Sequence, residues 1–478
     1  MGIRLLISIL ILNISFFMMC QTTNKNELLE FDSIVNHQVK KKETLYSISK
    51  LYDVNIDDII RLNSGIEKNR LKRKSFLIIP LKKKNKINFT KNESINNDRL
   101  DSVIFSSKFK KLLIENNFKR KRLNIALFAP FKLNTINLDS VNQTQKNLSE
   151  INLTTISLNF YNGLKTAVKE LEDKGVQINV NVFDTENSLE KIKQLKTLNL
   201  SSFDIIIGPF ISRNFNELSQ NIDSLIVSPF VTDNINLSKN VVITTPTDEI
   251  KSKFIYEIID KNIEKTEDQC VIVIADSNNI TKTSTLIEKF PNAELLKIDE
   301  NSLFIDPDVT DSIMDTNKEN WVFLETSKPN LISSITSLLS SQNNKKRKIK
   351  LFSTISGENY ENPNINLDNL GNISFLYPSN SKPNYSDSFK FFSRIFMNEY
   401  GNLPERISVR ARDLVFDLLL RTLVYGSFHN SLDHGETEYF QNKFDYILTT
   451  NSIMNKSFFI LQHSDLEVLE FNKQSKEN

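Results

Sequence analysis

The apolar and polar positions of His37–Pro80 predict a compact unit of four short elements. An apolar strand is expected around Val39. A helix is expected over Leu45–Tyr52, where the residues of one face recur at i, i+3, i+4 and i+7. A second helix should cover Ile56–Asn63, and a closing strand Ser75–Ile79 is ended by a proline. The order strand, helix, helix, strand defines a βααβ unit.

A longer α/β pattern occupies residues 122–478. It opens with the continuous apolar run LNIALFAPF, which is typical of a strand buried on both faces. Strands and helices then alternate, as in parallel sheets joined by crossover helices. The alternation of strands and helices starts again after a helix over Glu249–Asn262. We therefore expect two lobes with a ligand cleft beyond the carboxyl ends of their strands. The other expected strands are 176–183, 203–208, 225–230, 241–246, 269–276, 293–298, 320–326 and 348–354. The other expected helices begin near Thr155, start within PFISRNFNEL (209–218), or cover Leu189–Leu198, Thr281–Phe290, 308–314 and Asn330–Ser341.

The N-terminus has the pattern of an export signal. Arg4 precedes an apolar run over Leu5–Met19, which is short for a membrane span and ends at Cys20. Residues 1–20 resemble a bacterial lipoprotein signal peptide, and the resemblance implies that Cys20 is lipid-modified and becomes the new N-terminus. The alternative is an uncleaved membrane anchor. Residues 21–36 are polar and are expected to form a tether.

Charge and cysteine content narrow the class of protein. The 60 Lys and Arg residues against 58 Asp and Glu residues give a net charge of +2, so no global field favours nucleic acid as a partner. With Cys20 assigned to lipid, Cys270 has no disulfide partner and is interpreted as a small buried apolar side chain. Residues 82–121 are charged and rich in asparagine, and are expected to form a linker with one weakly helical piece at Val103–Leu113.

Residues 37–81 resemble the LysM module. The shared features are ETL (43–45) after the first strand, N-x-G (63–65) after the second helix, and a final I-P (79–80). The resemblance implies binding of glycans that contain N-acetylglucosamine, above all peptidoglycan. Thr44 is also expected to cap the first helix with its hydroxyl. The residues expected to contact glycan are Glu43, Thr44, Leu45, Asn63, Gly65 and Ile66.

Residues 122–478 resemble a type 1 periplasmic-binding-protein domain, the two-lobed receptor fold of amino-acid uptake systems. The resemblance is carried by FYNGLKTAVKEL, by DIIIGPFIS and LIVSPFVT at two strand ends, and by the late segment RARDLVFDLLLRTL. It implies one lobe made of residues 122–247 with 376–445, and another made of 248–375 with 446–475. By this resemblance Ser212 and Thr232 are the small-ligand residues, since a hydroxyl can donate to a carboxylate and accept from an ammonium. The alternative is that Ser212 caps its helix and Thr232 fills a turn.

Chemistry other than binding has little support in the sequence. The spacing of His429 and His434 does not fit a zinc pair on a helix, and a solvated loop is expected there. The chain lacks a phosphate loop, a G-x-G-x-x-G motif and a nucleophile elbow, so no cofactor, metal site or catalytic residue is expected. The segment 356–363 is expected to be a surface turn, although Glu358 or Tyr360 could contact a ligand.

The sequence therefore predicts a non-enzymatic lipoprotein of the cell envelope, held in the periplasm by its lipid, with the outer membrane favoured over the inner. LysM would bind peptidoglycan, and the two-lobed domain would bind a protein partner or a small ligand in cell-wall regulation. The first alternative is an amino-acid or small-solute receptor. The second is a peptidoglycan hydrolase.

Overall fold

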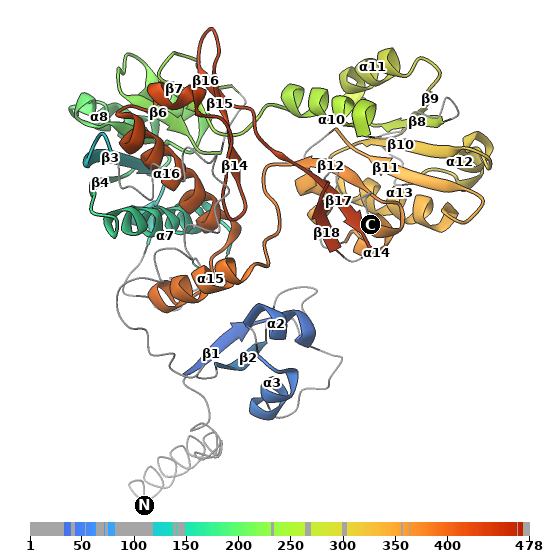
Figure 1. Ribbon diagram of the computed structural model, residues 1–478, viewed down its shortest axis with the longest axis horizontal. Coiled ribbons are helices and arrows are strands. Elements are labelled where there is room, and N and C mark those ends of the chain that lie inside the picture. The colour runs from blue at the N-terminus through green and yellow to red at the C-terminus, as the bar shows by residue number, and fades with distance from the viewer. Residues whose placement is uncertain are drawn as a thin grey trace, which may run out of the picture. The chain divides into compact units, whose positions relative to one another are not determined.

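The computed structural model describes residues 33–39, 44–52, 54–63, 71, 75–81, 118–136, 140, 148, 150–230, 234–262, 269–298, 304–354, 357–362, 364–465 and 467–471 (Figure 1). The expected signal peptide with Cys20 lies outside the described residues, as do most of the expected tether and the linker with its helical piece. Among the described residues, no helix combines the length and apolarity that crossing a bilayer requires.

Residues 33–81 form a unit of two strands and two helices, as expected. Its elements are β1 (Ser33–Gln38), α2 (Leu45–Tyr52), α3 (Ile56–Leu62) and β2 (Phe76–Leu81). The strands pair antiparallel, with Val35 opposite Ile79. The first strand begins at Ser33, inside the segment expected to be tether, and not around Val39. The core includes Leu45, Ile48, Ile59, Leu77 and Ile79, each at most 4% exposed.

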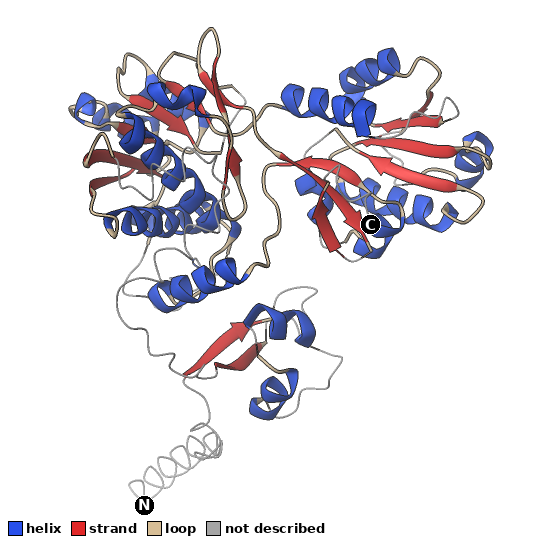
Figure 2. Ribbon diagram, viewed as in Figure 1, coloured by secondary structure: helices blue, strands red, loops and turns tan. Residues whose placement is uncertain are grey.

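The first lobe of the larger unit contains a seven-stranded sheet in the order β15-β16-β7-β6-β5-β3-β4 (Figure 2). Strands β3 to β7 and β16 run parallel, and β15 is antiparallel to β16. Helices α7 and α16 pack on one face, and α8 and α9 on the other. The strands are β3 (Arg122–Ala129), β4 (Gln177–Asp184), β5 (Ile205–Ile207), β6 (Leu225–Ser228), β7 (Val241–Ile243), β15 (Tyr446–Leu448) and β16 (Ile453–Asn455), and the helices are α7 (Leu153–Glu172), α8 (Leu189–Leu195), α9 (Ser212–Ser219), α15 (Asp387–Tyr400) and α16 (Arg406–Tyr425), with the small hairpin β13 (Thr437–Glu438) and β14 (Lys443–Phe444).

The second lobe has a seven-stranded sheet in the order β18-β17-β12-β11-β10-β8-β9. Helices α12, α13 and α14 cover one face, and α10 and α11 the other. The strands are β8 (Cys270–Ala275), β9 (Glu294–Lys297), β10 (Glu319–Glu325), β11 (Lys348–Phe352), β12 (Leu376–Ser379), β17 (Phe459–Ser464) and β18 (Glu467–Glu470), and the helices are α10 (Asp248–Asn262), α11 (Ile280–Lys289), α12 (Pro307–Ile313), α13 (Pro329–Gln342) and α14 (Leu367–Asn372).

The chain passes between the lobes at 244–247, 380–386 and 456–458 (Figure 1). The expected division of the lobes differs from this at two places. Leu376–Ser379 is strand β12 of the second sheet, and Tyr446–Asn455 supplies β15 and β16 to the first sheet. The cause is that β16 pairs in parallel with β7, which is far from it in the sequence. The order of apolar and polar residues along one segment does not show which distant strand it pairs with.

Helix α16 is the centre of the first lobe and packs most closely on α7. The close approach occurs at Gly163, where a Cβ atom would lie 2.1 Å from the backbone oxygen of Ser408. The aliphatic residues of α16 fill the core between the sheet and α7, and the helix also buries charged side chains. Among these, Arg421 and Asp417 are completely buried and form an ion pair at 2.9 Å.

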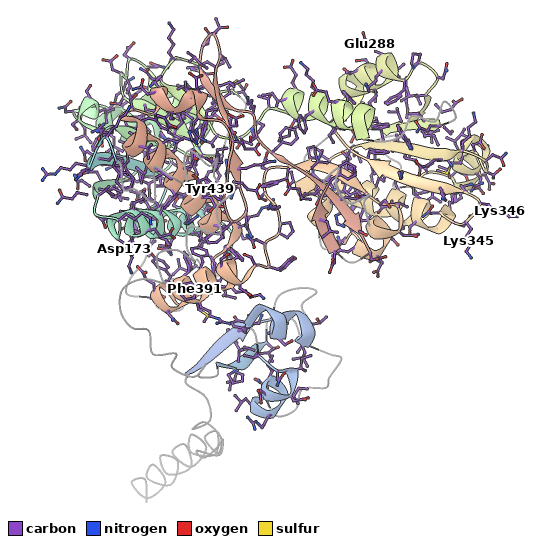
Figure 3. All side chains as sticks on the ribbon, in the orientation of Figure 1. Asp173, Glu288, Lys345, Lys346, Phe391 and Tyr439 are labelled. Atoms are coloured by element: carbon purple, nitrogen blue, oxygen red, sulfur yellow. The ribbon has the colours of Figure 1, made fainter. Side chains whose placement is uncertain are left out.

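Asp417 and Arg421 connect α16 to the segment 431–444. Asp417 accepts hydrogen bonds from the Thr437 hydroxyl at 2.7 Å and the Tyr439 hydroxyl at 2.9 Å. Arg421 donates to the Gly435 carbonyl at 3.0 Å and the Phe444 carbonyl at 3.2 Å. Figure 3 labels Tyr439 inside the first lobe. The pair therefore satisfies buried backbone groups as well as each other.

Replacing Arg421 by methionine should destabilise the protein by about 3–5 kcal/mol, because Asp417 is left buried without its cation. The double variant Arg421→Met, Asp417→Leu should lose less. Both are measured by urea unfolding followed by circular dichroism, with the exposed Arg213→Met as the control. A double variant no more stable than the single one would show that the uncompensated charge is not the cause.

Candidate functional site

The start of helix α2 carries two of the residues expected to contact glycan. Thr44 is exposed, and its carbonyl oxygen accepts the first helical hydrogen bond from the Ile48 N–H at 3.0 Å. This places Thr44 at the position before the helix, as expected. Leu45 is 4% exposed and packs in the core, so a glycan could reach only its backbone.

Asn63 connects the end of α3 to strand β2. Its side-chain nitrogen donates to the carbonyl oxygens of Ile59 at 2.7 Å and Ile78 at 2.6 Å. Its side-chain oxygen accepts from the Ile78 N–H at 2.7 Å. Both side-chain donors are thus used by the fold, and any glycan contact through the side chain would have to use the remaining oxygen lone pair. Glu43, Gly65 and Ile66 lie outside the described residues, and their expected contacts stay predictions.

The core of the same unit contains a polar pair that the sequence analysis did not single out. His37 and Tyr52 are both buried, and the His37 Nδ1 lies 2.9 Å from the Tyr52 hydroxyl. The two rings meet edge to face. The pair joins the first strand to the first helix.

In the first lobe, Ser212 lies beyond the carboxyl end of β5, where the sequence placed it. It is the first residue of α9 and half-buried. Ile211 takes the capping position, so Ser212 is not the cap of this helix. Thr232 lies outside the described residues, and its pairing with Ser212 stays a prediction.

Aromatic side chains occupy the neighbourhood of Ser212. The rings of Phe160, Phe210 and Phe230 lie in mutual contact, with centroids 5.0 to 5.4 Å apart. Phe210 and Phe230 lie a few residues after the ends of β5 and β6, so apolar rings lie near the carboxyl ends of these strands. Sequence reasoning missed this cluster because its three phenylalanines are distant in the chain.

The second lobe places two carboxylates at the carboxyl ends of neighbouring parallel strands. Asp276 follows β8, and Glu325 ends β10. Both are buried; Asp276 accepts from the Thr326 hydroxyl at 2.6 Å, and Glu325 accepts from the Thr354 N–H at 2.8 Å and hydroxyl at 2.9 Å. Burial, followed by the charge of Glu325, raises the pKa of Tyr360, which keeps this phenol neutral. The sequence signal that could have identified Asp276 and Glu325 is that each acidic residue ends a run of apolar residues.

A cavity of about 310 Å³ lies where β12, β17 and the crossing segment 380–386 meet the first lobe. Its apolar lining includes Leu461, Leu367 and the rings of Tyr377 and Tyr360. Tyr360 is 2% exposed and its hydroxyl donates to the Leu324 carbonyl at 3.2 Å, so its segment is not the surface turn that was expected. Tyr377 lies so close to Gly357 that a Cβ there would be 1.9 Å from the ring.

The charged side chains that line this cavity are Lys382 and Arg406. Lys382 forms ion pairs with Glu438 and with Glu470, the latter at 2.9 Å. Burial alone would lower the pKa of Lys382, but its hydrogen bonds to the two carboxylates outweigh this effect and raise it. Arg406 is exposed at the start of α16 and donates from Nε to the Ser381 hydroxyl at 2.9 Å.

His463 contributes a neutral imidazole to the same cavity. The residue is 4% exposed and packs against Phe375 and Tyr377, and its ring nitrogens form no hydrogen bond with the described part of the chain. Burial lowers the pKa of His463 to about 4. The segment expected to be a solvated loop is a short 3-10 helix, His429–His434. In it His434 bonds the Tyr425 hydroxyl, and the exposed His429 lies 3.4 Å from the Lys239 carbonyl oxygen.

Cys270, expected to be a buried apolar side chain, is half-buried in β8. Its thiol donates to the Ile313 carbonyl at 3.3 Å. Burial raises the pKa of Cys270, which disfavours the reactive thiolate.

Comparison with protein families decides the nature of the N-terminal unit. The family model described as LysM domain matches residues 37–80, which include both helices, the end of β1 and nearly all of β2. Residues 37–80 are a LysM domain. LysM domains bind peptidoglycan, and the described core of this LysM domain contains the two helices and paired strands that its sequence predicted.

Comparison with solved structures concerns the larger unit. A branched-chain amino acid ABC transporter protein from Rhodospirillum rubrum aligns with 74% of this chain and 100% of its own, with a TM-score of 0.50 and 11% identity. The isoleucine complex of LivJ from Streptococcus pneumoniae covers 73% of this chain and 100% of its own, with a TM-score of 0.40 and 14% identity. LpoA of Haemophilus influenzae aligns over 76% of this chain and 61% of its own, with a TM-score of 0.44 and 13% identity.

At these identities the likeness shows the fold, and the larger unit has the two-lobed α/β fold of type 1 periplasmic binding proteins. A search of curated proteins finds no relative of this chain.

Replacing Asn63 by alanine should destabilise the LysM domain by about 1–2 kcal/mol, because partly buried backbone groups of Ile59 and Ile78 lose their hydrogen-bond partner. Hydrogen exchange of the Ile78 amide measures this, and the amide should exchange faster. Asn55→Ala is the matched control, because the Asn55 side chain forms no capping bond. Equal exchange in the two variants would show that the Asn63 bonds do not hold the strand.

Acid should destabilise the second lobe through His463. Its folded pKa of about 4 lies below the unfolded value of about 6.5, so the unfolded chain binds the proton more readily. Above about pH 6.5 the proton equilibrium of His463 does not lower the free energy of unfolding. As the pH falls below this value the free energy of unfolding decreases, by about 2–3 kcal/mol at pH 4.5. His463→Phe should remove this part of the pH dependence in urea unfolding between pH 7 and 4.5. An unchanged slope in the variant would assign the acid sensitivity to other groups.

Proposed function

We propose that this protein is a non-enzymatic, lipid-anchored protein of the cell envelope that binds peptidoglycan through its LysM domain. Its two-lobed domain then binds a partner or a small ligand near the cell wall, in the regulation of the wall. The observation that carries the proposal is the LysM domain at residues 37–80, placed before a fold used for binding.

The placement of the domains supports a tethered role. A receptor that serves a transporter has to diffuse to its permease, whereas a wall-binding module restricts diffusion. Lipid attachment at Cys20 would restrict it further and place the LysM domain next to the membrane. The outer membrane is the favoured location, since peptidoglycan lies directly beneath it.

The first lobe supports a role other than amino-acid uptake. Its strand ends carry the Phe160, Phe210 and Phe230 cluster, which offers neither donors nor acceptors to a ligand carboxylate or ammonium. Ser212 remains the polar side chain proposed for ligand contact there. The amino-acid receptor is therefore the second reading of the two-lobed domain.

Sedimentation with purified peptidoglycan sacculi tests the proposal. The detergent-solubilised full chain should sediment with sacculi, and a variant lacking residues 37–80 should stay in solution. A variant lacking 82–117 is the control, because it shortens the chain by a similar length and keeps the LysM domain. Soluble chitin oligomers should compete with sacculi for the full chain.

Sedimentation that does not depend on residues 37–80 would contradict the assignment of wall binding to LysM. The same incubation tests the absence of enzymatic activity, because the supernatant should contain no soluble glycan fragments. Their release would identify the protein as a hydrolase.

A further inference from the structure

The cavity of about 310 Å³ between β12, β17 and the segment 380–386 differs from the predicted Ser212 and Thr232 site in place and in chemistry. It lies between the face of the second sheet that α14 covers and the start of α16 in the first lobe, whereas Ser212 begins α9. Its volume is within the range of sites for small organic molecules. Its walls are mostly apolar with a few polar groups, which is the usual make-up of such sites.

The apolar walls select the body of a ligand. Leu367, Leu461 and Val468 provide aliphatic surface, and the Tyr377 ring provides an aromatic one. Tyr377 is held in place because it stacks on Phe375, with ring centroids 4.6 Å apart, and lies against Gly357. A pre-formed apolar wall of this kind favours a ring or a branched aliphatic group.

The charges select the polar end. Lys382 and Arg406 line the cavity, and its described lining contains no aspartate or glutamate. Glu438 and Glu470, which pair with Lys382, are not part of the lining. These two carboxylates neutralise the charge of Lys382, so Arg406 is the cation whose charge favours an anion in the cavity. A ligand ammonium would find no carboxylate in the described lining to pair with.

His463 adds an independent observation. It is 4% exposed, it lines the cavity, and its ring nitrogens have no hydrogen-bond partner in the described part of the chain. Because His463 lines the cavity, a ligand oxygen there would supply a hydrogen bond to its imidazole.

We propose that this cavity binds a small monocarboxylate with an apolar body, such as an aryl or branched aliphatic acid, and that amino acids are excluded. The apolar body packs on Tyr377 and Leu461, Arg406 binds the carboxylate, and His463 donates to it. The inference rests on the proposed receptor role of the two-lobed domain and names its ligand class.

The ligand would also connect the two lobes. Tyr377, Leu461 and His463 belong to the second sheet, whereas Arg406 begins α16 of the first lobe. Bridging by a carboxylate therefore stabilises the arrangement in which Arg406 faces the cavity. A partner that contacts both lobes would therefore bind the ligand-occupied protein and the empty protein with different affinities.

Calorimetry of the full chain with three matched probes tests the inference. The probes are 3-phenylpropanoate, its uncharged amide 3-phenylpropanamide, and L-phenylalanine, which adds an ammonium to the same skeleton. We expect 3-phenylpropanoate to bind, and the other two to bind at least about 10-fold more weakly. Tighter binding of L-phenylalanine would overturn the inference in favour of an amino-acid receptor, and absence of heat with 3-phenylpropanoate would also overturn it.

Variants locate the site. Arg406→Met should weaken 3-phenylpropanoate binding about 10- to 100-fold, because a charge-assisted hydrogen bond is lost. Arg213→Met is the matched control, an exposed arginine in the first lobe, and should bind like the parent. Leu367→Trp, at a residue 42% exposed, should block the cavity without disturbing the core. Parent-like binding by both Arg406→Met and Leu367→Trp would place the ligand elsewhere.

The sacculus experiment separates the two proposals. If the cavity does not bind 3-phenylpropanoate, LysM-dependent sedimentation with sacculi is unaffected. If the LysM domain does not bind sacculi, calorimetry with 3-phenylpropanoate still measures binding at the cavity.

Discussion

The burial of Asp413 and Asp417 on α16 is the constraint from which the architecture of the larger unit follows. Neither carboxylate is exposed, so each needs hydrogen bonds from within the fold. Asp417 obtains them from Arg421, Thr437 and Tyr439, and Asp413 from Gln441 and Asn442 at 3.0 Å each. Two charges on one helix thereby hold the β13–β14 hairpin against it.

That hairpin in turn holds a segment crossing between the lobes. The Gln441 carbonyl accepts from the Lys382 N–H at 3.0 Å, and Glu438 pairs with the Lys382 ammonium. Asn384 donates to the Phe440 carbonyl at 2.6 Å. The crossing segment that lines the cavity is thus positioned by contacts that begin at the buried aspartates. A second crossing is held by Asn455, which donates to the carbonyls of Thr244 at 3.1 Å and Ser457 at 3.2 Å.

The order of apolar and polar residues predicted the positions of the helices and strands well, but it predicted the pairing of sequence-distant strands poorly. The helix Leu45–Tyr52 has the expected bounds, and α10 and α13 lie within one residue of theirs, since apolar periodicity reports which face of an element is buried. The short strand β16 was assigned to the wrong lobe. Its three residues are too few to show an alternation of apolar and polar positions, and its partner strand β7 is distant in the sequence.

The candidate sites divide in the same way. Ser212 lies beyond the end of β5, where its motif placed it, and its contact with a ligand stays a prediction. The cavity was missed, because Tyr377, Arg406 and His463 come together only through the crossing segments. Asn63 was expected to contact glycan and was found bonded to the backbone of Ile59 and Ile78; a sequence shows that an asparagine is present but not where its hydrogen bonds go.

The pairing of Ile453 with Val242 also bears on how the chain is made. Strands β3 to β7 can align as soon as they are synthesised, but their sheet stays open at the β7 edge until β16 arrives after the entire second sheet except β17 and β18. Neither lobe can be completed from an uninterrupted piece of chain. A nascent molecule would therefore expose the hydrogen-bonding groups of β7, and folding of the first lobe depends on its sequence-distant final strands.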